Sequence, residues 1–289
     1  MTTDYSQYNN ALQEALNNSY QKMPHQKSGY QRSAGITYQV PKTWKRTDTP
    51  ITGRVCYVVA TWSGPRRAGN GMHAEDPTQY LVKHFEQLAS LEHDLNQIIL
   101  ATPHNPEEPD HFKSYIDSLG SEVCGTPLQI LRRENIGQSY GSYSDAFLQN
   151  PDFDYYIFIE DDYVPVIDNF DNLLVQMFQH SPECGYLCSY AHNRPPDGPH
   201  AAISNGISSK AMLKKVADAF SCLPYGGDST TKYAYSASPQ LEFSRAFMRV
   251  HSKIYDYLSY FRAPFNEAGK LVTYGNPQLP SLIDPIQFL

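Results

Sequence analysis

The chain contains the run Tyr155-Tyr156-Ile157-Phe158-Ile159-Glu160-Asp161-Asp162-Tyr163-Val164-Pro165, in which five apolar or aromatic residues are followed directly by three acids. An apolar run of this length predicts a strand that is buried on both faces. Three neighbouring carboxylates repel one another unless a cation lies among them or water reaches them freely. Because open α/β sheets bind ligands at the carboxyl ends of their strands, the acids predict a divalent-metal site there. A solvated strand end without a ligand is the alternative.

The segments around this strand alternate between strand and helix signals. Short apolar runs predict further strands at 55–61, 95–101, 128–131, 185–191 and 203–207. Apolar residues at helical spacing, with proline or glycine near the ends, predict helices that start at Asp76-Pro77 and that cover 110–119, 138–149, 170–178, 210–220 and 241–260. This order predicts an α/β fold with a mostly parallel central sheet and helices on both faces.

The first 50 residues differ in composition from the rest. They are rich in Gln, Asn, Ser and Tyr and poor in aliphatic residues. We therefore expect residues 1–50 to form a polar N-terminal arm, with a weak helix at 6–23, that packs on the body or on another subunit of a homo-oligomer. The remaining residues, 51–289, are expected to form a single domain.

Composition narrows the choice of partners. The formal net charge is −7 and there is no basic run, so nucleic acid is a poor partner. The chain has no apolar stretch of the roughly 18 residues that a membrane span requires, and its beginning lacks the pattern of a signal peptide. The five cysteines have no zinc-site spacing and predict buried free thiols in a reducing compartment. We therefore expect a cytoplasmic protein without a transmembrane segment.

A second motif precedes the acidic strand. It reads Arg132-Arg133-Glu134-Asn135-Ile136-Gly137-Gln138-Ser139-Tyr140-Gly141 and lies between a predicted strand and a predicted helix. Gly137 and Gly141 are four residues apart, so they share one helical face and allow a close approach of backbone. The helix N-terminus and the two arginines can face a phosphate. Packing of the helix against its neighbours is the alternative explanation of the glycines.

Together these two motifs resemble the GT-A nucleotide-sugar glycosyltransferases, particularly the large inverting family 2. The run from Val55 to Trp62 also looks like the opening strand of that family, and the resemblance covers roughly residues 54–260. It implies a GT-A, Rossmann-like fold, a nucleoside diphosphate sugar donor such as a UDP- or GDP-sugar, and a glycan or other hydroxyl acceptor. It also implies a nucleotide-sugar-binding half, 51–165, and an acceptor-binding half, 166–289.

The resemblance assigns roles to the acids. It implies that Asp162 binds Mn²⁺ or Mg²⁺ directly, while Asp161 or Glu160 contacts the ribose or the water around the metal. Side chains alternate along a strand, so Glu160 and Asp162 are expected on one face and Asp161 on the other. The metal would bridge the two phosphates of the donor. The residues that the resemblance places against the nucleotide are Thr61, Trp62, Ser63, Arg66 or Arg67, Arg132, Asn135, Gly137 and Asp161.

An inverting transfer also needs a general base beside the acceptor hydroxyl. The resemblance places it at the start of a late helix, and the match here is Glu242, although Leu241 stands where an acidic pair would have its other member. An acid at a helix start is also favoured by the helix dipole alone. Asp228, in a glycine-containing loop, is the second candidate. The small residues at 203–208 either line the floor of a sugar site or turn the chain.

The leading hypothesis is thus a metal-dependent glycosyltransferase, with inversion implied by the resemblance. One alternative is a sugar-nucleotide pyrophosphorylase, which shares the sheet but would want a glycine-rich loop with arginine and lysine after the first strand. The loop at 63–71 lacks the lysine. Another alternative is a non-catalytic binding or assembly protein that retains the fold.

Overall fold

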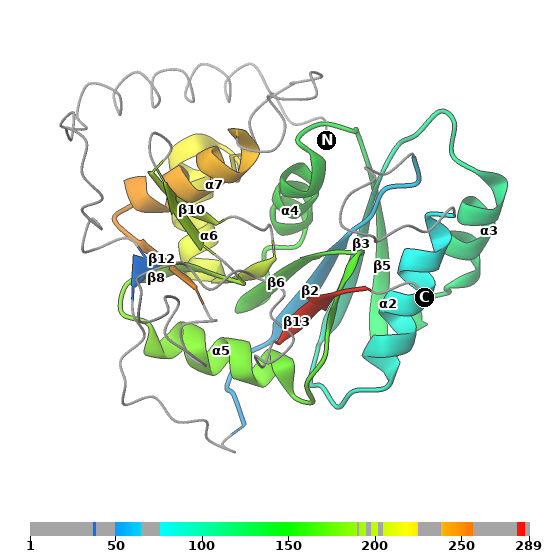
Figure 1. Cartoon of the computed structure of the whole chain (residues 1–289), viewed down its shortest axis with the longest axis horizontal. Helices are drawn as coiled ribbons and strands as arrows, with labels where there is room; N and C mark the ends of the chain where they lie inside the picture. The colour runs from blue at the N-terminus through cyan, green and yellow to red at the C-terminus, as the bar shows by residue number, and fades with distance from the viewer. Residues whose placement is uncertain are drawn as a thin grey trace.

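The computed structural model describes eight parts of the chain, which lie at 37–38, 50–64, 76–189, 191–194, 198–201, 205–224, 238–256 and 282–286. The predicted N-terminal arm, with its weak helix, lies almost entirely outside these described residues. Figure 1 shows a central sheet flanked by helices. The α/β fold class with helices on both faces is therefore confirmed.

The strand order places the acidic run in the middle of the sheet. The nine-stranded sheet has the order β1-β12-β8-β11-β6-β2-β3-β5-β4. Its strands are β1 (Thr37–Tyr38), β2 (Val55–Ala60), β3 (Gln97–Pro103), β4 (Glu122–Val123), β5 (Thr126–Arg133), β6 (Tyr155–Glu160), β8 (Cys184–Cys188), β11 (Gly206–Ser209) and β12 (Lys253–Asp256). Two small antiparallel sheets pair β9 (Ala191–Arg194) with β10 (Gly198–Ala201), and β7 (Tyr163–Pro165) with β13 (Ile283–Pro285).

Most neighbouring strands of the large sheet run parallel, as predicted. The pairs β2–β3, β2–β6, β3–β5, β8–β12 and β1–β12 are parallel. β11 is antiparallel to both β6 and β8, and β4 is antiparallel to β5. The start of β11 therefore lies at the same edge as the carboxyl ends of β6 and β8.

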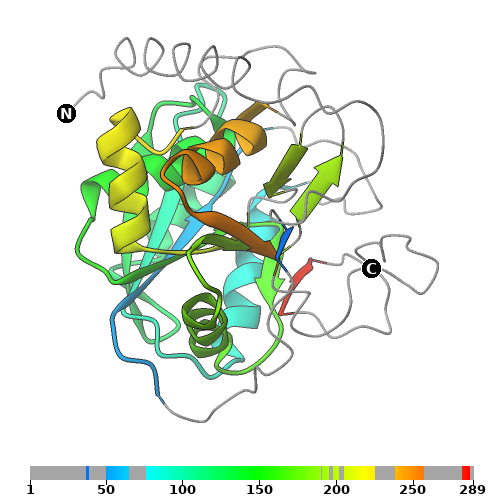
Figure 2. The ribbon, with the colours of Figure 1, turned by 90° about the vertical axis from the view of Figure 1, so that its left-hand side faces the viewer.

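Two layers of helices cover the sheet. α4 (Gln138–Gln149), α6 (Lys210–Phe220) and α7 (Ser238–Arg249) bury their apolar faces in one core, and α2 (Thr78–Ala89), α3 (Asp110–Ser118) and α5 (Phe170–His180) bury theirs in the other. Figure 2 shows α6 and α7 on the opposite side of the sheet from α5. None of the helices in the described part of the chain combines the length and apolarity that a membrane crossing requires.

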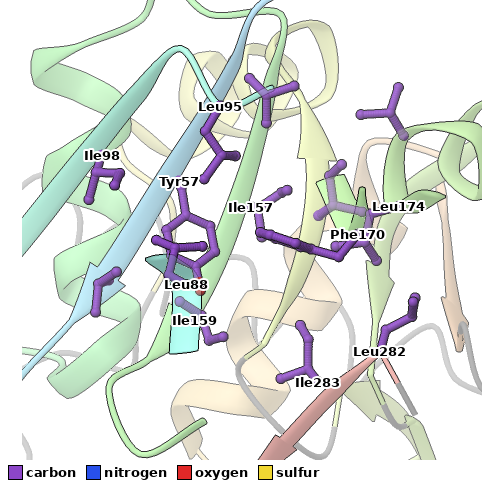
Figure 3. Close-up of a cluster of buried hydrophobic side chains, with 14 of the residues drawn as sticks. Tyr57, Leu88, Leu95, Ile98, Ile157, Ile159, Phe170, Leu174, Leu282 and Ile283 are labelled. Atoms are coloured by element: carbon purple, nitrogen blue, oxygen red, sulfur yellow. The ribbon is translucent and has the colours of Figure 1, made fainter. Parts of the chain in front are cut away.

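Side chains of the central strand alternate between these two cores. Tyr156 and Phe158 of β6 lie in the core beneath α4 and α7, whereas Ile157 and Ile159 lie in the core beneath α5. All four are fully buried, as the apolar run predicts. Figure 3 shows Ile157 beside Phe170 of α5, and Ile159 belongs to the same core.

One predicted element is wrong in its second half. The helix expected at 241–260 begins at Ser238 and ends at Arg249, and the chain then forms β12. His251 has a left-handed backbone, with φ of +59°, and the Ser252 hydroxyl donates to the Phe247 carbonyl oxygen at 2.8 Å, which ends the helix. Ile254 is then fully buried in β12, which pairs with β8. The strand expected at 185–191 likewise ends early, at Cys188.

The five cysteines are free thiols. Four of them are buried, Cys56, Cys184, Cys188 and Cys222, and Cys124 is half-buried. Burial raises the pKa values of Cys56, Cys124, Cys184 and Cys222, and that of Cys124 reaches about 11. The prediction of mostly buried free thiols is confirmed.

Candidate functional site

The ends of three parallel strands meet at one edge of the sheet. In the register of the sheet, Ala60 at the end of β2 lies between Glu160 of β6 and Ala101 of β3. The backbone continues this pairing beyond β2, because the Thr61 amide donates to the Ala101 carbonyl and the Asp161 amide donates to the Ala60 carbonyl, each at 3.0 Å. Thr61 and the acids of the 155–165 run are therefore neighbours, as the resemblance requires.

Asp161 is held in place by a hydroxyl from the first strand. The Thr61 Oγ1 hydroxyl donates to Asp161 Oδ2 at 2.5 Å, and the two residues are only 4% and 2% exposed. Hydrogen bonds to an ionised acceptor are short and about twice as strong as neutral ones. The contact fixes the direction of the carboxylate at the strand end.

A buried histidine that the sequence did not single out lies beneath Asp161. His84 of α2 is fully buried, and its Nε2 atom lies 3.0 Å from the Tyr57 hydroxyl. Burial lowers the pKa of His84 to about 4, and the nearby Asp161 carboxylate only partly opposes that shift. His84 is therefore neutral near pH 7 and adds no cation beside the acids. Its place on the buried face of α2, between Leu81 and Phe85, was the signal available in the sequence.

Glu160 faces the other core, which contains Tyr140 and Tyr186. Burial first, and the nearby Glu160 carboxylate in addition, raise the pKa values of Tyr140 and Tyr186 well above the ordinary tyrosine value. The Glu160 amide donates to Asn205 Oδ1 at 2.9 Å. Glu160 and Asp161 thus continue the alternation of β6 to opposite faces, as predicted.

Asp162 lies at the turn between β6 and β7 and is half-buried. Its carbonyl oxygen accepts a hydrogen bond from the Ile286 amide at 2.8 Å, which ties the turn to the end of the chain. Burial raises the pKa of Tyr163, and the nearby charges of Asp162 and Glu160 raise it further.

The acids suit a metal ion whose other ligands are substrate and water oxygen atoms. Within the described residues, no group of three or more His, Cys, Asp or Glu side chains is gathered as a metal cage. Mg²⁺ in nucleotide enzymes is commonly held by one or two carboxylates together with phosphates and water. Asp161 and Asp162, adjacent hard oxygen donors with the first one already oriented, fit that kind of site.

Both arginines of the second motif have carboxylate partners. Arg133 Nε donates to Asp145 Oδ2 of α4 at 2.7 Å, and the two side chains are 2% and 8% exposed. Arg132 Nη1 donates to Glu108 Oε1 at 2.8 Å, and its side chain is 31% exposed. Arg133 therefore fixes the start of α4, whereas Arg132 still reaches the surface. Neither partner could be predicted from the sequence.

The glycines of this motif shape the turn before α4. Gly137 precedes the helix with φ of +75°, a left-handed conformation that glycine adopts without strain. A Cβ atom on Gly141 would lie 2.0 Å from the Ile136 carbonyl oxygen and 2.4 Å from Arg133 Nη2. Arg133 Nη2 itself donates to that carbonyl at 2.5 Å. Asn135 lies exposed in the same turn.

The other two residues expected at the nucleotide follow β2 directly. Ser63 is buried, and its hydroxyl oxygen accepts a hydrogen bond from Asn105 Nδ2 at 3.1 Å. Trp62 is half-buried, and its ring lies so close to Gly64 that a Cβ atom there would be 2.5 Å away. Asn105, which follows β3, thus holds Ser63, which follows β2. The Trp62 ring packs against the backbone at Gly64.

Glu242 lies on the same side of the sheet as Glu160. It is 9% exposed, and it stands close enough to Cys222 that its charge, after burial and Asp145, raises the pKa of that thiol. The next residue, Phe243, has its ring centroid 5.0 Å from those of both Tyr140 and Tyr186. Glu242 therefore adjoins the aromatic cluster that borders Glu160.

Several predicted residues lie outside the described residues. They are Arg66, Arg67 and Asp228, together with most of the loop at 63–71 and the segment 202–204. Their roles stay predictions from the sequence.

The chain was compared with known proteins. No protein-family model matches it, and no curated protein does. Among solved structures it is similar to a cytidylyltransferase from Leptospira borgpetersenii serovar Hardjo-bovis, with a TM-score of 0.41 and 14% identity over 71% of this chain and 75% of that one. It is also similar to a CMP:2-keto-3-deoxy-manno-octonic acid synthetase in complex with CTP, with a TM-score of 0.43 and 11% identity over 70% and 88%. Neither is named as a glycosyltransferase. Sequence identities this low indicate similarity of the fold alone, and both TM-scores lie below 0.5.

Proposed function

We propose that the chain is a metal-dependent glycosyltransferase, which moves a sugar from a nucleoside diphosphate sugar to an acceptor hydroxyl. The observation that carries this proposal is the buried Asp161 carboxylate, which Thr61 orients at the shared carboxyl end of β2 and β6. An oriented carboxylate followed by a second one, at the edge where α/β sheets bind ligands, suits a cation and a diphosphate.

Under this proposal, different residues bind the metal ion and the nucleotide. Asp161 and Asp162 would hold Mn²⁺ or Mg²⁺, which when bound supplies positive charge against the leaving diphosphate. Ser63 and partly exposed Arg132, near the ends of β2 and β5, would bind the nucleotide, a UDP or GDP group, and Thr61 would orient Asp161.

The base belongs to the second half of the chain. Glu242 would accept the proton of the acceptor hydroxyl, and Asp228 is the other candidate. Under this proposal residues 51–165 bind the donor and residues 166–289 bind the acceptor. An inverted product would follow from direct attack of the acceptor on the sugar.

A second candidate is a sugar nucleotidyltransferase. In that reaction a sugar phosphate oxygen attacks the α-phosphate of a nucleoside triphosphate, and pyrophosphate leaves. The burial of Glu242 favours this candidate, because a side chain that is only 9% exposed, near the Cys222 thiol, is poorly accessible to an acceptor. An already ionised phosphate needs no general base, so the reaction would use the acids at β6 without Glu242.

Binding and product measurements separate the two candidates. UDP, GDP, CMP and dTDP would be tested by thermal shift with and without Mn²⁺. A ligand at 100 times its Kd stabilises a protein by about 2.7 kcal/mol, which is about 5–10 °C for a domain of this size. Release of a nucleoside diphosphate from its sugar conjugate supports glycosyl transfer, and release of pyrophosphate from a nucleoside triphosphate and a sugar phosphate supports the second candidate. A protein that binds none of these nucleotides would be a non-catalytic one.

Asp162 provides the matching variant. Asp162→Asn is expected to abolish the Mn²⁺-dependent part of nucleotide binding and the transfer activity. Asp117→Asn, an exposed acid on α3, serves as the control and should behave as the unmodified protein does. Full activity of Asp162→Asn, or full activity in excess chelator, would contradict the proposal.

A further inference from the structure

The turn that carries Asp162 is held by a segment from much later in the sequence. Residues 282–286, the clasp segment, contain β13, which pairs with β7 directly after the turn. In the described part of the chain, β13 is the only strand that pairs with β7, because β7 does not belong to the large sheet. The clasp segment therefore supplies the strand pairing that β7 has.

The pairing reaches Asp162 itself. At one end of β7, the Ile286 amide donates to the Asp162 carbonyl oxygen at 2.8 Å. At the other end, the Val166 amide donates to the Leu282 carbonyl oxygen at 3.0 Å. Both contacts keep the register of the antiparallel pair, so the ladder runs without a break from Asp162 to Val166. The backbone of Asp162 is its first member.

Apolar side chains anchor the clasp segment at two places. Leu282 and Ile283 are fully buried in the core between the large sheet and α5, and Figure 3 shows both of them in this cluster. Ile286 is 4% exposed and packs with Tyr80 of α2 and Val164 of β7. The segment thus connects the large sheet, β7 and α2 around the turn.

The two acids of the candidate metal site are held by different parts of the chain. Asp161 is fixed through its hydrogen bonds with Thr61 and with the Ala60 carbonyl at the end of β2. Asp162 is fixed at its backbone by Ile286. Adjacent carboxylates can share one cation only when the backbone between them holds a defined conformation, so both supports bear on the site.

We infer that the clasp segment is a positioning element of the cation site, which acts by holding the backbone of Asp162. Partners that orient a metal ligand typically change metal affinity by about 10–100-fold. The coupling is reciprocal, since a docked segment that favours the cation is itself favoured by the bound cation to the same degree. This inference rests on the proposed function and deepens it, because it gives part of the expected acceptor half, 166–289, a task at the cation of the donor.

Ile286 allows the backbone contact to be removed with a small change in apolar volume. Ile286→Pro lacks the N–H that donates to Asp162, whereas Ile286→Val keeps it. Leu213→Ala is a second control, because Leu213 of α6 is fully buried in the opposite core. It should lower the melting temperature at least as much as Ile286→Pro does, without touching the turn.

Calorimetry with UDP and GDP, with and without Mn²⁺, measures the effect on the site. Ile286→Pro should weaken the Mn²⁺-dependent binding about tenfold or more and leave metal-free binding unchanged. Ile286→Val and Leu213→Ala should bind as the unmodified protein does. An equal loss in Ile286→Pro with and without Mn²⁺, or a similar loss in Leu213→Ala, would show that the clasp segment contributes only general stability, and would overturn the inference.

Hydrogen exchange in the unmodified protein gives a measurement that needs no variant to fold. Mn²⁺ together with UDP or GDP should slow exchange of the Ile286 amide about tenfold, the reciprocal of the loss in binding. The Leu128 amide, which donates to the Ser121 carbonyl oxygen at 2.8 Å near the other edge of the sheet, is the control and should change less. Exchange at Ile286 that is indifferent to Mn²⁺ would also overturn the inference.

Product analysis separates this inference from the proposed function. If Ile286→Pro loses Mn²⁺-dependent binding but the protein makes pyrophosphate from a nucleoside triphosphate and a sugar phosphate, the proposed function is wrong and the inference stands. If sugar is transferred and Ile286→Pro binds Mn²⁺ and nucleotide normally, the inference is wrong and the proposed function stands. If neither nucleotide binds with Mn²⁺, both fail.

Discussion

At the scale of single residues, the structure shows a contact of Thr61 that the sequence did not reveal. The resemblance placed it against the nucleotide, but its hydroxyl is directed at Asp161. Under the proposed function, a threonine that orients this acid would act on the cation and the diphosphate through it, as a positioning residue.

Thr61→Val tests this role because valine has nearly the same shape and no hydroxyl. We expect Mn²⁺-dependent binding of UDP or GDP to weaken about tenfold, which corresponds to about 1.4 kcal/mol. Calorimetry with and without Mn²⁺ measures it. Binding in the absence of metal should be unchanged, and Thr61→Ser should restore the affinity. An equal loss with and without Mn²⁺ would instead indicate direct contact between Thr61 and the nucleotide.

The acids at the end of β6 could be predicted from the sequence, whereas the contacts of the two arginines could not. The acids of β6 could be identified because their positions follow from one strand and its end. The partners of Arg132 and Arg133 could not, because Glu108 belongs to the loop before α3 and Asp145 lies two turns into α4. Asn205 was missed for the same reason, since it becomes notable only through its hydrogen bond with the Glu160 amide.

At the scale of elements, the start of α4 requires glycine, a residue without a side chain, at position 141. Alanine is a better helix former than glycine by about 1 kcal/mol, so helix propensity alone predicts that Gly141→Ala stabilises the protein. The contact with the Ile136 carbonyl predicts the opposite, because backbone must move to admit the Cβ atom. Overpacking of this kind typically costs about 1–3 kcal/mol.

We therefore expect Gly141→Ala to lower the free energy of unfolding, measured by urea titration. Ser139→Ala in the same helix is the control and should change it little. A gain in stability for Gly141→Ala would show that the turn between Arg133 and α4 can shift at little cost.

Elements with clear ends were predicted well, and those without were not. α4 and α6 have the predicted bounds, since apolar spacing and the flanking residues agree there. The end of α7 was missed because Phe243 and Phe247 are followed by further apolar residues at 254–255, which extend the helical pattern. Those residues are apolar because β12 is buried beside β8. Tertiary burial, not helix periodicity, explains them.

At the scale of the whole molecule, stability should depend on a buried acid far from the candidate site. Asp171 in the first turn of α5 is fully buried, and its Oδ2 atom accepts a hydrogen bond from the Asp94 amide at 2.8 Å. Burial raises the pKa of Asp171, and hydrogen bonds from Asp94 and Asn172 only partly oppose this. The folded protein therefore holds this proton to higher pH than the unfolded chain does, and stability falls as pH rises through the raised pKa.

Asp171→Asn keeps an oxygen for the Asp94 amide and removes the charge. We expect it to raise the melting temperature at pH 7 by on the order of 2–4 °C. The gain should shrink as the pH is lowered toward the ordinary carboxyl range near about 4. Differential scanning calorimetry across this range measures it, with Asp117→Asn as an exposed control. A gain that is independent of pH would mean that the charge of Asp171 is not the cause.

The fold class followed from the sequence because buried strands and amphipathic helices alternate along most of the chain. The strand order did not, because the position of β11 between β6 and β8 is a matter of long-range pairing. That antiparallel strand brings Asn205 to the edge where β6 ends, and the Asn205 side-chain oxygen there accepts a hydrogen bond from the Glu160 amide.

The position of β6 has a consequence for synthesis of the chain. Its partner β2 is made before it, but its other partner, β11, leaves the ribosome only after the segment from Glu160 to Gly206 has been added. At about 5–20 residues per second this takes a few seconds. During that interval an apolar strand containing Ile157 and Phe158 has an open edge, the arrangement that favours pairing with other chains. A bound chaperone should therefore improve the yield of folded protein, and a chain cut after Pro165 should aggregate.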